Sequence, residues 1–349
     1  MKWIHTPCST RDNSFKEYAL KRQSQLTKPA GSLGTLEDIA VRLADCLQTK
    51  KPQINNINIA VFAADHGVAA EGVSAFPQEV TAQMVANFLQ GGAAISVLAK
   101  QLGAQLDIVD LGTLTPFPSQ QGLTVKNIGS GTANSANEEA MSADQLEQAF
   151  NAGKEIIEKA VTEKADIFIG GEMGIANTTS ASALYCALLN LSPEEATGAG
   201  TGLDESGISH KTTVIKRILE KHQSCGDDTL AWLRCAGGFE IAALTGAYIH
   251  AAQSGIPILV DGFISSVAAL CAFKINPSTN DYLFFSHLSA EQGHKKVLSV
   301  LNQKPILDLG LRLGEGSGAA IAVNLLQTAC NLHNEMATFE EAAVATQNS

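Results

Sequence analysis

The sequence has few basic residues and no basic run, which argues against a nucleic-acid-binding protein. Its 24 lysines and arginines are outnumbered by 35 aspartates and glutamates, so that the formal net charge is −11. No run of lysine or arginine is longer than two. Proteins that bind nucleic acid normally carry a basic stripe or patch on their surface. We therefore expect no nucleic-acid partner, and an anionic substrate would have to be bound by locally placed donors and helix ends.

The cysteines lack the spacing of zinc sites and of disulfide frameworks. There are seven, an odd number, no CxxC motif occurs, and most lie in apolar stretches such as the one around Cys186. This usage favours reduced thiols in a cytoplasmic protein. The N-terminus shows no signal-peptide pattern, and no apolar run reaches the ~18 residues that a membrane span needs. We therefore expect a cytoplasmic protein without a membrane span.

Aromatic residues are scarce, and small residues take their place. Aromatics make up 5% of the 349 residues, whereas glycine alone occurs 30 times. Hydrophobic residues account for 45%, which is typical of a globular protein with a sizeable core. Small residues suit helices packed tightly on a sheet and backbone turns close to a ligand.

Short apolar segments recur along the chain and predict buried strands. They are rich in β-branched residues, lack polar alternation, and most precede a glycine- or serine-containing loop and then a helix. We expect strands at 57–63, 106–111, 165–170, 256–260, 282–285 and 306–309, and helices over 79–100 and 143–159. Strands covered on both faces are typical of a parallel sheet. The sequence thus predicts an α/β fold with a mostly parallel, doubly wound sheet and flanking helices.

The two ends of the chain predict a small helical domain. Residues 10–25 and 340–345 have helical composition. We expect residues 1–50 and 336–349 to form this small domain together, and residues 51–335 to form the large α/β catalytic domain.

The loops that follow strands of a parallel sheet are where ligands bind. The first such loop places Asp65 next to His66. This pair suits a metal or acid–base role, but Asp65 is equally suited to bracing loop backbone with His66 paired to it. A metal would need three or four convergent ligands, and no second histidine cluster occurs. We predict no metal site, and the role of the pair stays open.

An apolar segment after this loop suits a flat heteroaromatic ligand. Phe76 precedes a proline at a helix start, and Gln83 and Met84 lie one turn into that helix. An apolar slot with one or two polar contacts is typical of such binding sites. An ordinary helix start explains the same residues.

Two glycine-rich loops predict contacts to an anion. In the segment 170–179, three glycines and Glu172 stand between a strand and a helix, an arrangement that lets backbone amides approach a phosphate. The segment 198–204 precedes a helix that carries Lys211, a good point-charge partner for phosphate. The alternatives are a tight turn for the first loop and a surface lysine for the second.

Glu315 is the candidate general base. It lies between Gly314 and Gly316 at the start of an alanine-rich helix. The helix N-terminus favours its ionised form, whereas burial would raise its pKa. A carboxylate in this position is suited to accepting a proton, although a helix-capping role would also explain it.

Seven blocks occur in one order along the chain: Leu26–Gly34, Asp65–Val68, Gly72–Ser74, Pro77–Thr81, Asn87–Ile95, Gly171–Thr179 and Gly314–Gly318. Together they closely resemble the nicotinate-nucleotide–dimethylbenzimidazole phosphoribosyltransferases. The resemblance covers nearly the whole chain.

The resemblance implies an activity, a dimer and a set of site residues. The reaction converts nicotinate mononucleotide and 5,6-dimethylbenzimidazole to α-ribazole 5′-phosphate and nicotinate, in the assembly of the cobalamin nucleotide loop. It implies a homodimer, small-molecule substrates, no cofactor, and Glu315 as the catalytic base. The substrate-binding residues that we predict are Glu172, Gly174, Asn177, Gly202, Lys211, Gly316, Gly318, Phe76, Gln83, Met84, Met173 and Leu313.

Two other functions fit parts of the pattern. Glycine loops in an α/β order also suit a dinucleotide-dependent oxidoreductase, but the GxGxxG motif with an acidic residue ~20 positions later is missing. A non-catalytic carrier would bind the benzimidazole or the nucleotide without releasing nicotinate.

Overall fold

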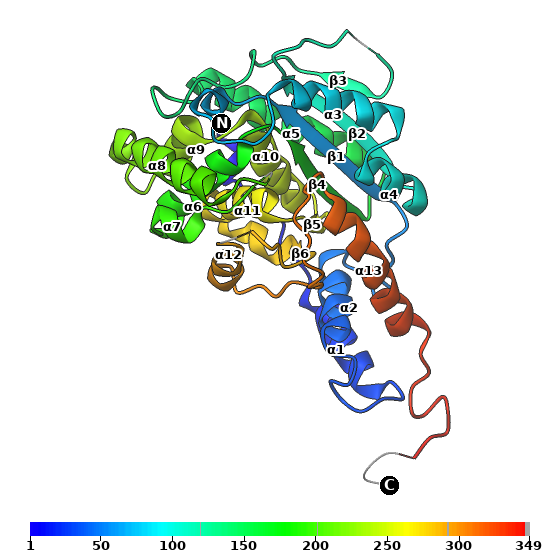
Figure 1. Cartoon of the computed structure of the whole chain (residues 1–349). Helices are drawn as coiled ribbons and strands as arrows, with labels where there is room; N and C mark the ends of the chain where they lie inside the picture. Colours follow the sequence, from blue (N-terminus) through cyan, green and yellow to red (C-terminus); the bar gives the residue numbers. More distant parts are fainter. Residues whose placement is uncertain (119, 201, 292, 346–349) are drawn as a thin grey trace.

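The centre of the fold is a parallel six-stranded sheet (Figure 1). The computed structural model describes residues 1–118, 120–200, 202–291 and 293–345. Within them the strands are β1 (Ile57–Ala64), β2 (Gln105–Gly112), β3 (Leu123–Val125), β4 (Ile167–Met173), β5 (Ile258–Val260) and β6 (Leu283–Phe285). The spatial order is β3-β2-β1-β4-β5-β6, and every neighbouring pair is parallel. The predicted parallel α/β fold is confirmed.

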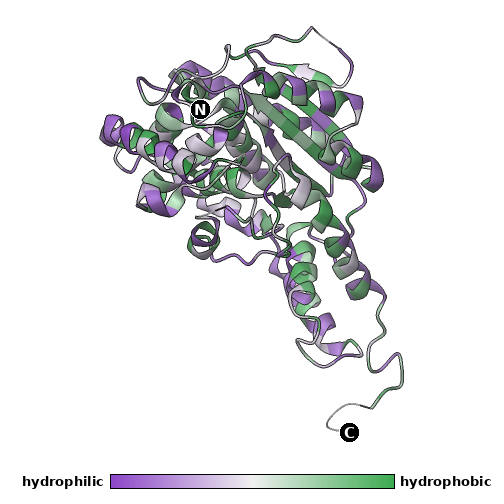
Figure 2. Ribbon diagram, viewed as in Figure 1, coloured by the Kyte–Doolittle hydropathy of each residue, from purple (hydrophilic) through white to green (hydrophobic). Residues whose placement is uncertain are grey.

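The strands are apolar because both faces of the sheet are covered. All eight residues of β1 are buried, as are the three of β5 and of β6. Figure 2 shows hydrophobic residues along the central strands and polar residues on the outer faces of the helices. A strand buried on both faces gains from apolar side chains at every position, which explains the absence of alternation in the sequence.

Helices form a layer on each face of the sheet. One layer consists of α5 (Ala143–Thr162), α10 (Phe239–Gln253) and α11 (Phe263–Ile275), and the other of α3 (Glu79–Gln90), α4 (Ala94–Leu102) and α13 (Ser317–Glu335). The helices α6 (Asn177–Leu189), α7 (Pro193–Ala196), α8 (Glu205–Lys221), α9 (Thr229–Ala236) and α12 (His294–Val300) lie on the side of β5 and β6 (Figure 1).

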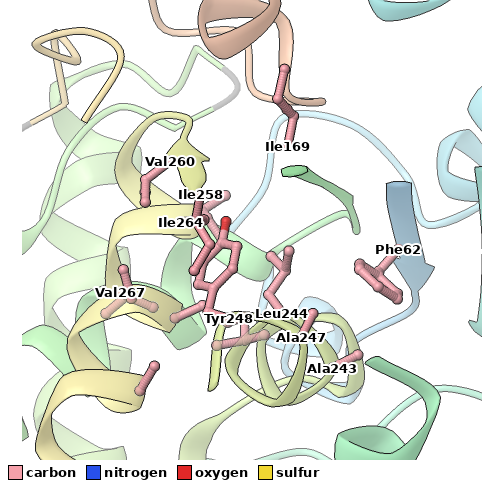
Figure 3. Packing of buried hydrophobic residues seen from close by; sticks show 14 of the residues in the cluster. Phe62, Ile169, Ala243, Leu244, Ala247, Tyr248, Ile258, Val260, Ile264 and Val267 are labelled. Carbon is pink, nitrogen blue, oxygen red and sulfur yellow. The ribbon is translucent and has the colours of Figure 1, made fainter. Parts of the chain in front are cut away.

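Glycine in β4 lets α10 approach the sheet closely. A β-carbon at Gly170 would lie 2.4 Å from Leu244 Cδ2 and 2.9 Å from the Tyr248 hydroxyl oxygen. That hydroxyl donates to the Gly170 carbonyl at 3.4 Å. Leu244 and Tyr248 point from α10 toward the strands in Figure 3. The close packing fixes β4, and therefore the residues at its carboxyl end.

The two N-terminal helices pack with the far end of α13. These are α1 (Asn13–Gln25) and α2 (Thr35–Cys46), which project from the main body in Figure 1. Gln23 contacts the ring of His333 at 3.0 Å, and Arg22 donates to the His333 carbonyl at 2.6 Å. Arg42 of α2 also donates to the Leu283 carbonyl at 2.6 Å, which ties this end to β6. The boundaries expected for a separate small domain stay a prediction, and residues 346–349 lie outside the described part.

The predicted strand at 306–309 is wrong. Leu307 forms only an isolated parallel bridge to His287, although the amides of Ile306 and Leu307 donate to carbonyls of residues 285 and 286. Pro305 has no amide hydrogen, and Gly310 turns the chain with a φ of 67°. The segment therefore extends the edge of the sheet without forming a ladder.

The predicted C-terminal helix at 340–345 is also wrong. Residues 339–343 form turns, and Ala343 has a left-handed φ of 51°, which stops helical propagation. Conversely, the three-residue strand β3 was not predicted, because it is too short to show a pattern.

The predicted helix over 79–100 is two helices, because Gly91 has a left-handed φ of 80° and ends α3. By length and composition alone, the stretch Glu79–Leu102 is the one apolar segment of the described residues able to cross a membrane, and a third of it (33%) is buried. The break leaves helices of 12 and 9 residues, each shorter than the ~20 residues of a typical span.

Candidate active site

A cavity of about 460 Å³ opens at the carboxyl ends of β4, β5 and β6. It lies beside the β1–β4 boundary, where the strand order reverses and where α/β sheets commonly bind ligands. The lining residues are Phe76, Val80, Met84, Glu172, Met173, Gly174, Ile175, Asn177, Thr178, Gly200, Asp261, Gly262, Phe263, Ile264, His287, Ser289, Glu291, Arg312, Leu313, Gly314 and Glu315.

The cavity gathers most of the predicted site residues from three separate parts of the chain. Those on its wall are Phe76, Met84, Glu172, Met173, Gly174, Asn177, Leu313 and Glu315. Five others are not on the wall: Gln83, Gly202, Lys211, Gly316 and Gly318. Gly316 and Gly318 lie at the start of α13, directly after Glu315, and Lys211 lies behind Thr178.

Glu172 belongs to strand β4, whereas the sequence had suggested that it lies in a loop. The strand runs through Gly170 and Gly171, two of the three glycines of the segment, and ends at Met173. The side chain is 6% exposed and accepts a short hydrogen bond from Asn177. Burial raises the pKa of Glu172 well above 4.5, and the nearby carboxylates Glu240 and Asp261 raise it further.

Glu315 lies in a turn whose three residues are all left-handed. The φ angles of Gly314, Glu315 and Gly316 are 94°, 64° and 86°. This turn rests directly on β4, since a β-carbon at Gly171 would lie 2.2 Å from the Glu315 carbonyl oxygen. The local sequence Gly-Glu-Gly therefore satisfies a backbone requirement as well as a chemical one.

The Glu315 carboxyl group is held away from bulk water. It is 6% exposed, and its Oε2 atom is buried without a hydrogen-bond partner. Burial raises the pKa of Glu315 above 4.5 and Asp261 adds to the rise, whereas the Ile95 amide at the start of α4 lowers it. A buried carboxylate with a raised pKa and one oxygen without a partner, in a residue that lines a cavity, is suited to accepting a proton.

Asp261 and His287 are site residues that the sequence analysis missed. Asp261 follows β5, is 1% exposed, and accepts from the amides of Gly316 and Ala319 at 3.1 and 2.9 Å. His287 follows β6, with its Nδ1 atom 3.9 Å from an Asp261 oxygen. Both lie within two residues of the end of a predicted strand, which is the one sequence signal that points to them.

A second group of charged residues forms another part of the cavity. The Lys211 ammonium is buried and donates to Thr178 Oγ1 at 2.7 Å, and a β-carbon at Gly200 would lie 3.2 Å from its nitrogen. Burial lowers the pKa of Lys211 to about 8. Arg312 and Glu291 line the cavity nearby, and burial raises the pKa of Glu291 while Lys211 and Arg312 lower it. These cations and the loop amides suit a phosphate.

Apolar side chains form the mouth of the cavity. Phe76 and Leu313 are 50% and 63% exposed, and Met84 and Val80 of α3 lie on the wall. Gln83 of the same helix is exposed and is not on this wall. The mouth suits a flat, largely apolar ring.

Asp65 and His66 lie behind the cavity wall. Asp65 accepts from the Leu114 amide at 2.8 Å, so that it braces loop backbone. His66 is fully buried and contacts Glu240 at 2.7 Å and Ser180 at 3.1 Å, and not Asp65. Within the described residues, no group of three or more His, Cys, Asp or Glu side chains is arranged to hold a metal ion.

The sheet order and the acidic cavity at its carboxyl edge are those of an α/β enzyme. Similarity to known proteins identifies its family. Residues 8–344 match the sequence profile of a phosphoribosyltransferase family. The chain is 57% identical over 343 residues to the nicotinate-nucleotide–dimethylbenzimidazole phosphoribosyltransferase of Pseudomonas fluorescens strain SBW25, covering 98% of each protein. A relative of the same name from strain Pf-5 is 56% identical with the same coverage.

A solved structure agrees with the sequence comparison. The crystal structure of CobT from Thermus thermophilus is 43% identical, with a TM-score of 0.91, over 95% of this chain and 99% of that one. The chain therefore belongs to the nicotinate-nucleotide–dimethylbenzimidazole phosphoribosyltransferases, and the resemblance predicted from its motifs is confirmed.

Proposed function

We propose that the enzyme transfers ribose 5-phosphate from nicotinate mononucleotide to 5,6-dimethylbenzimidazole, yielding α-ribazole 5′-phosphate and nicotinate. The names of its relatives support these substrates. The observation that carries the chemistry is the buried Glu315 carboxylate, with one oxygen free of partners, on the wall of an apolar-mouthed cavity. This transfer provides the lower ligand of cobalamin.

The chemistry needs one base and no strong acid. The nicotinate ring leaves as a neutral ring nitrogen, because in the nucleotide that nitrogen carries the positive charge of a pyridinium. The incoming benzimidazole attacks through its unprotonated nitrogen, and its other ring nitrogen then loses a proton. Glu315 takes that proton, and the raised pKa that burial gives it strengthens it as a base.

The stereochemistry requires both rings in the cavity at once. A β-nucleotide gives an α-product, so the acceptor attacks the anomeric carbon on the face opposite the leaving ring. Holding both rings at near-attack distance supplies ~7–11 kcal/mol of the barrier. We assign Phe76, Met84 and Leu313 to the acceptor ring, and Glu172 and Asn177 to the ribose. All five line the cavity, which supports these assignments.

The phosphate is assigned to the second group of charged residues. Arg312 on the wall, and Lys211 directly behind Thr178 of the wall, offer positive charge to an anion there. Gly174 lies on the same wall, and Gly202 continues the Gly200 loop. This assignment separates the anion from Glu172, Asp261 and Glu315, and places it beside Glu291, whose carboxyl group interacts with both cations.

We also propose that the enzyme acts as a homodimer in the cytoplasm. The family resemblance supports the dimer, and the seven cysteines, all of which are free in the structure, support a reducing compartment. Sedimentation analysis should give twice the chain mass of 36.6 kDa.

The test is nicotinate release from the two substrates by wild type and by Glu315→Gln. The amide cannot accept the ring proton, so turnover should fall by ~10²–10⁴-fold while nicotinate mononucleotide still binds. Glu155→Gln makes the same chemical change on an exposed helix position outside the cavity and should retain activity. Full turnover in Glu315→Gln would exclude it as the base. Binding without nicotinate release by the wild type would instead indicate a carrier, and a nicotinamide dinucleotide bound to the purified protein would indicate an oxidoreductase.

A further inference from the structure

A carboxylate on a neighbouring strand holds the turn that carries Glu315. Asp261 Oδ2 accepts from the Gly316 amide at 3.1 Å, and Asp261 Oδ1 accepts from the Ala319 amide at 2.9 Å. These are the N-cap amide and the third amide of α13, and no side chain at the N-cap of α13 makes a capping bond. Asp261 thus takes the role of a helix cap from another part of the fold.

The turn needs such an anchor because its backbone conformation is unfavourable. Glu315 has a β-carbon and a φ of 64°, between two glycines that are also left-handed. A non-glycine residue keeps this conformation only when its surroundings fix it. Gly171 of β4 supports the turn through its close contact with the Glu315 carbonyl, and Asp261 binds the amide of Gly316 on the C-terminal side of Glu315.

We propose that Asp261 is a positioning residue that, by anchoring the first turn of α13, holds the Glu315 carboxylate toward the acceptor ring. This inference rests on the proposed function, in which Glu315 is the base. Asp261 acts through Glu315 and through the backbone amides, since those amides occupy both of its oxygens.

Asp261 also bears on the charge of the base. The charged and titratable side chains that share the cavity wall with Glu315 are Glu172, Asp261, His287, Glu291 and Arg312. Of these, Asp261 is the one whose charge raises the pKa of Glu315, in addition to the larger effect of burial. Glu315 must be ionised to accept a proton, so activity rises as the pH passes its pKa. Removing the charge of Asp261 lowers that pKa and moves the acid limb of the pH–rate profile to lower pH.

The first experiment compares Asp261→Asn with Asp110→Asn. Asp110 is matched in burial and role, since it is 3% exposed at the end of β2 and accepts from the amides of Gly112 and Thr113, but it lies outside the cavity wall. An asparagine at 261 turns a donor toward one of the two amides and so releases the turn. A displacement of ~1 Å at a reacting group costs ~10²-fold in rate, so kcat of Asp261→Asn should fall by about 10²-fold with a small change in KM.

Two results would overturn the inference. One is a loss of kcat in Asp261→Asn no greater than in Asp110→Asn, with the acid limb unmoved. The other comes from the double variant Asp261→Asn with Glu315→Gln. If Asp261 acts through Glu315, its substitution should not lower kcat further in the Glu315→Gln background, whereas losses of kcat that multiply would mean an independent role. In either case wild-type nicotinate release still tests the proposed function separately.

Asp261→Glu separates the effect of carboxylate position from the effect of charge. It also tests the inference if the Asp261→Asn variant does not fold. It keeps the negative charge but shifts the carboxylate by one methylene. We expect a lower kcat with the acid limb at its wild-type position, and again no further loss in the Glu315→Gln background. Wild-type kcat in Asp261→Glu, or a loss that multiplies with that of Glu315→Gln, would contradict the inference.

Discussion

Gly171→Ala tests, with a single methyl group, how β4 supports the turn that carries Glu315, the proposed base. The new β-carbon would lie 2.2 Å from the Glu315 carbonyl oxygen, 2.4 Å from its carbon and 2.8 Å from the Gly316 amide nitrogen. All three are backbone atoms, so no flexible side chain can move aside. Gly171 itself is fixed by pairing with Val61 in the neighbouring strand. The turn must therefore move, and not the strand.

The size of the effect follows from the distance. Restoring ordinary contact requires the Glu315 backbone to move by ~1 Å, a displacement that costs ~10²-fold when a catalytic group is misplaced. Overpacking a tight contact costs ~1–3 kcal/mol of stability. We therefore expect kcat/KM to fall by about 10²-fold, together with a modest loss in melting temperature.

The assay is nicotinate release on the folded variant, with Gly246→Ala as the control. A β-carbon at Gly246 would lie 2.5 Å from the Phe150 carbonyl, in the contact between α5 and α10, outside the cavity wall. That variant should lose stability while its folded fraction keeps its turnover. The reasoning is refuted if Gly171→Ala turns over no more slowly than Gly246→Ala.

Two pH-dependent predictions concern the other charged groups. Burial lowers the pKa of Lys211 to about 8, so the cation is lost as the pH rises through that value, and KM for nicotinate mononucleotide should rise there. Lys211→Arg keeps its charge and should flatten this rise of KM with pH. An unchanged dependence of KM on pH in that variant would argue against the phosphate assignment. Burial raises the pKa of Glu172 above 4.5, so the native state holds the carboxyl proton more tightly than the unfolded state. The protonated carboxyl group therefore stabilises the fold below pH 4.5, and this stabilisation is lost as the pH rises through the native pKa. Glu172→Gln should therefore raise the melting temperature at neutral pH and reduce its decline with pH, and an unchanged melting curve would contradict this.

The sequence predicts the sheet well where the strand signal is local. β1, β4, β5 and β6 follow from largely apolar runs, because burial on both faces favours apolar side chains at nearly every position. β2 was also predicted, although it carries Asp107 and Asp110 and is buried only from its fourth residue onward. The errors occur where backbone geometry overrides composition. Pro305 and Gly310 prevent a ladder at 306–309, and Gly91 breaks the helix over 79–100, although the side chains around them fit the predicted elements.

The site was predicted in part because its carboxylates stand among glycines. Glu172 and Glu315 stood out for that reason, and the structure places both on one wall. Asp261 and His287 did not, because a single polar residue after a short apolar run looks like an ordinary cap. Their importance comes from contacts with α13 and with each other, which depend on the strand order and not on spacing along the chain.

The placement of Glu172 within a strand has a consequence for how the cavity fills. Its backbone pairs with Phe62 of β1, so the side chain cannot swing out to regain water. Burial and the neighbouring carboxylates disfavour its negative charge, whereas the Asn177 amide and a positively charged ring beside it favour that charge. A pyridinium ring beside Glu172 therefore lowers the pKa of this carboxyl group, which links binding of the donor nucleotide to release of a hydrogen ion.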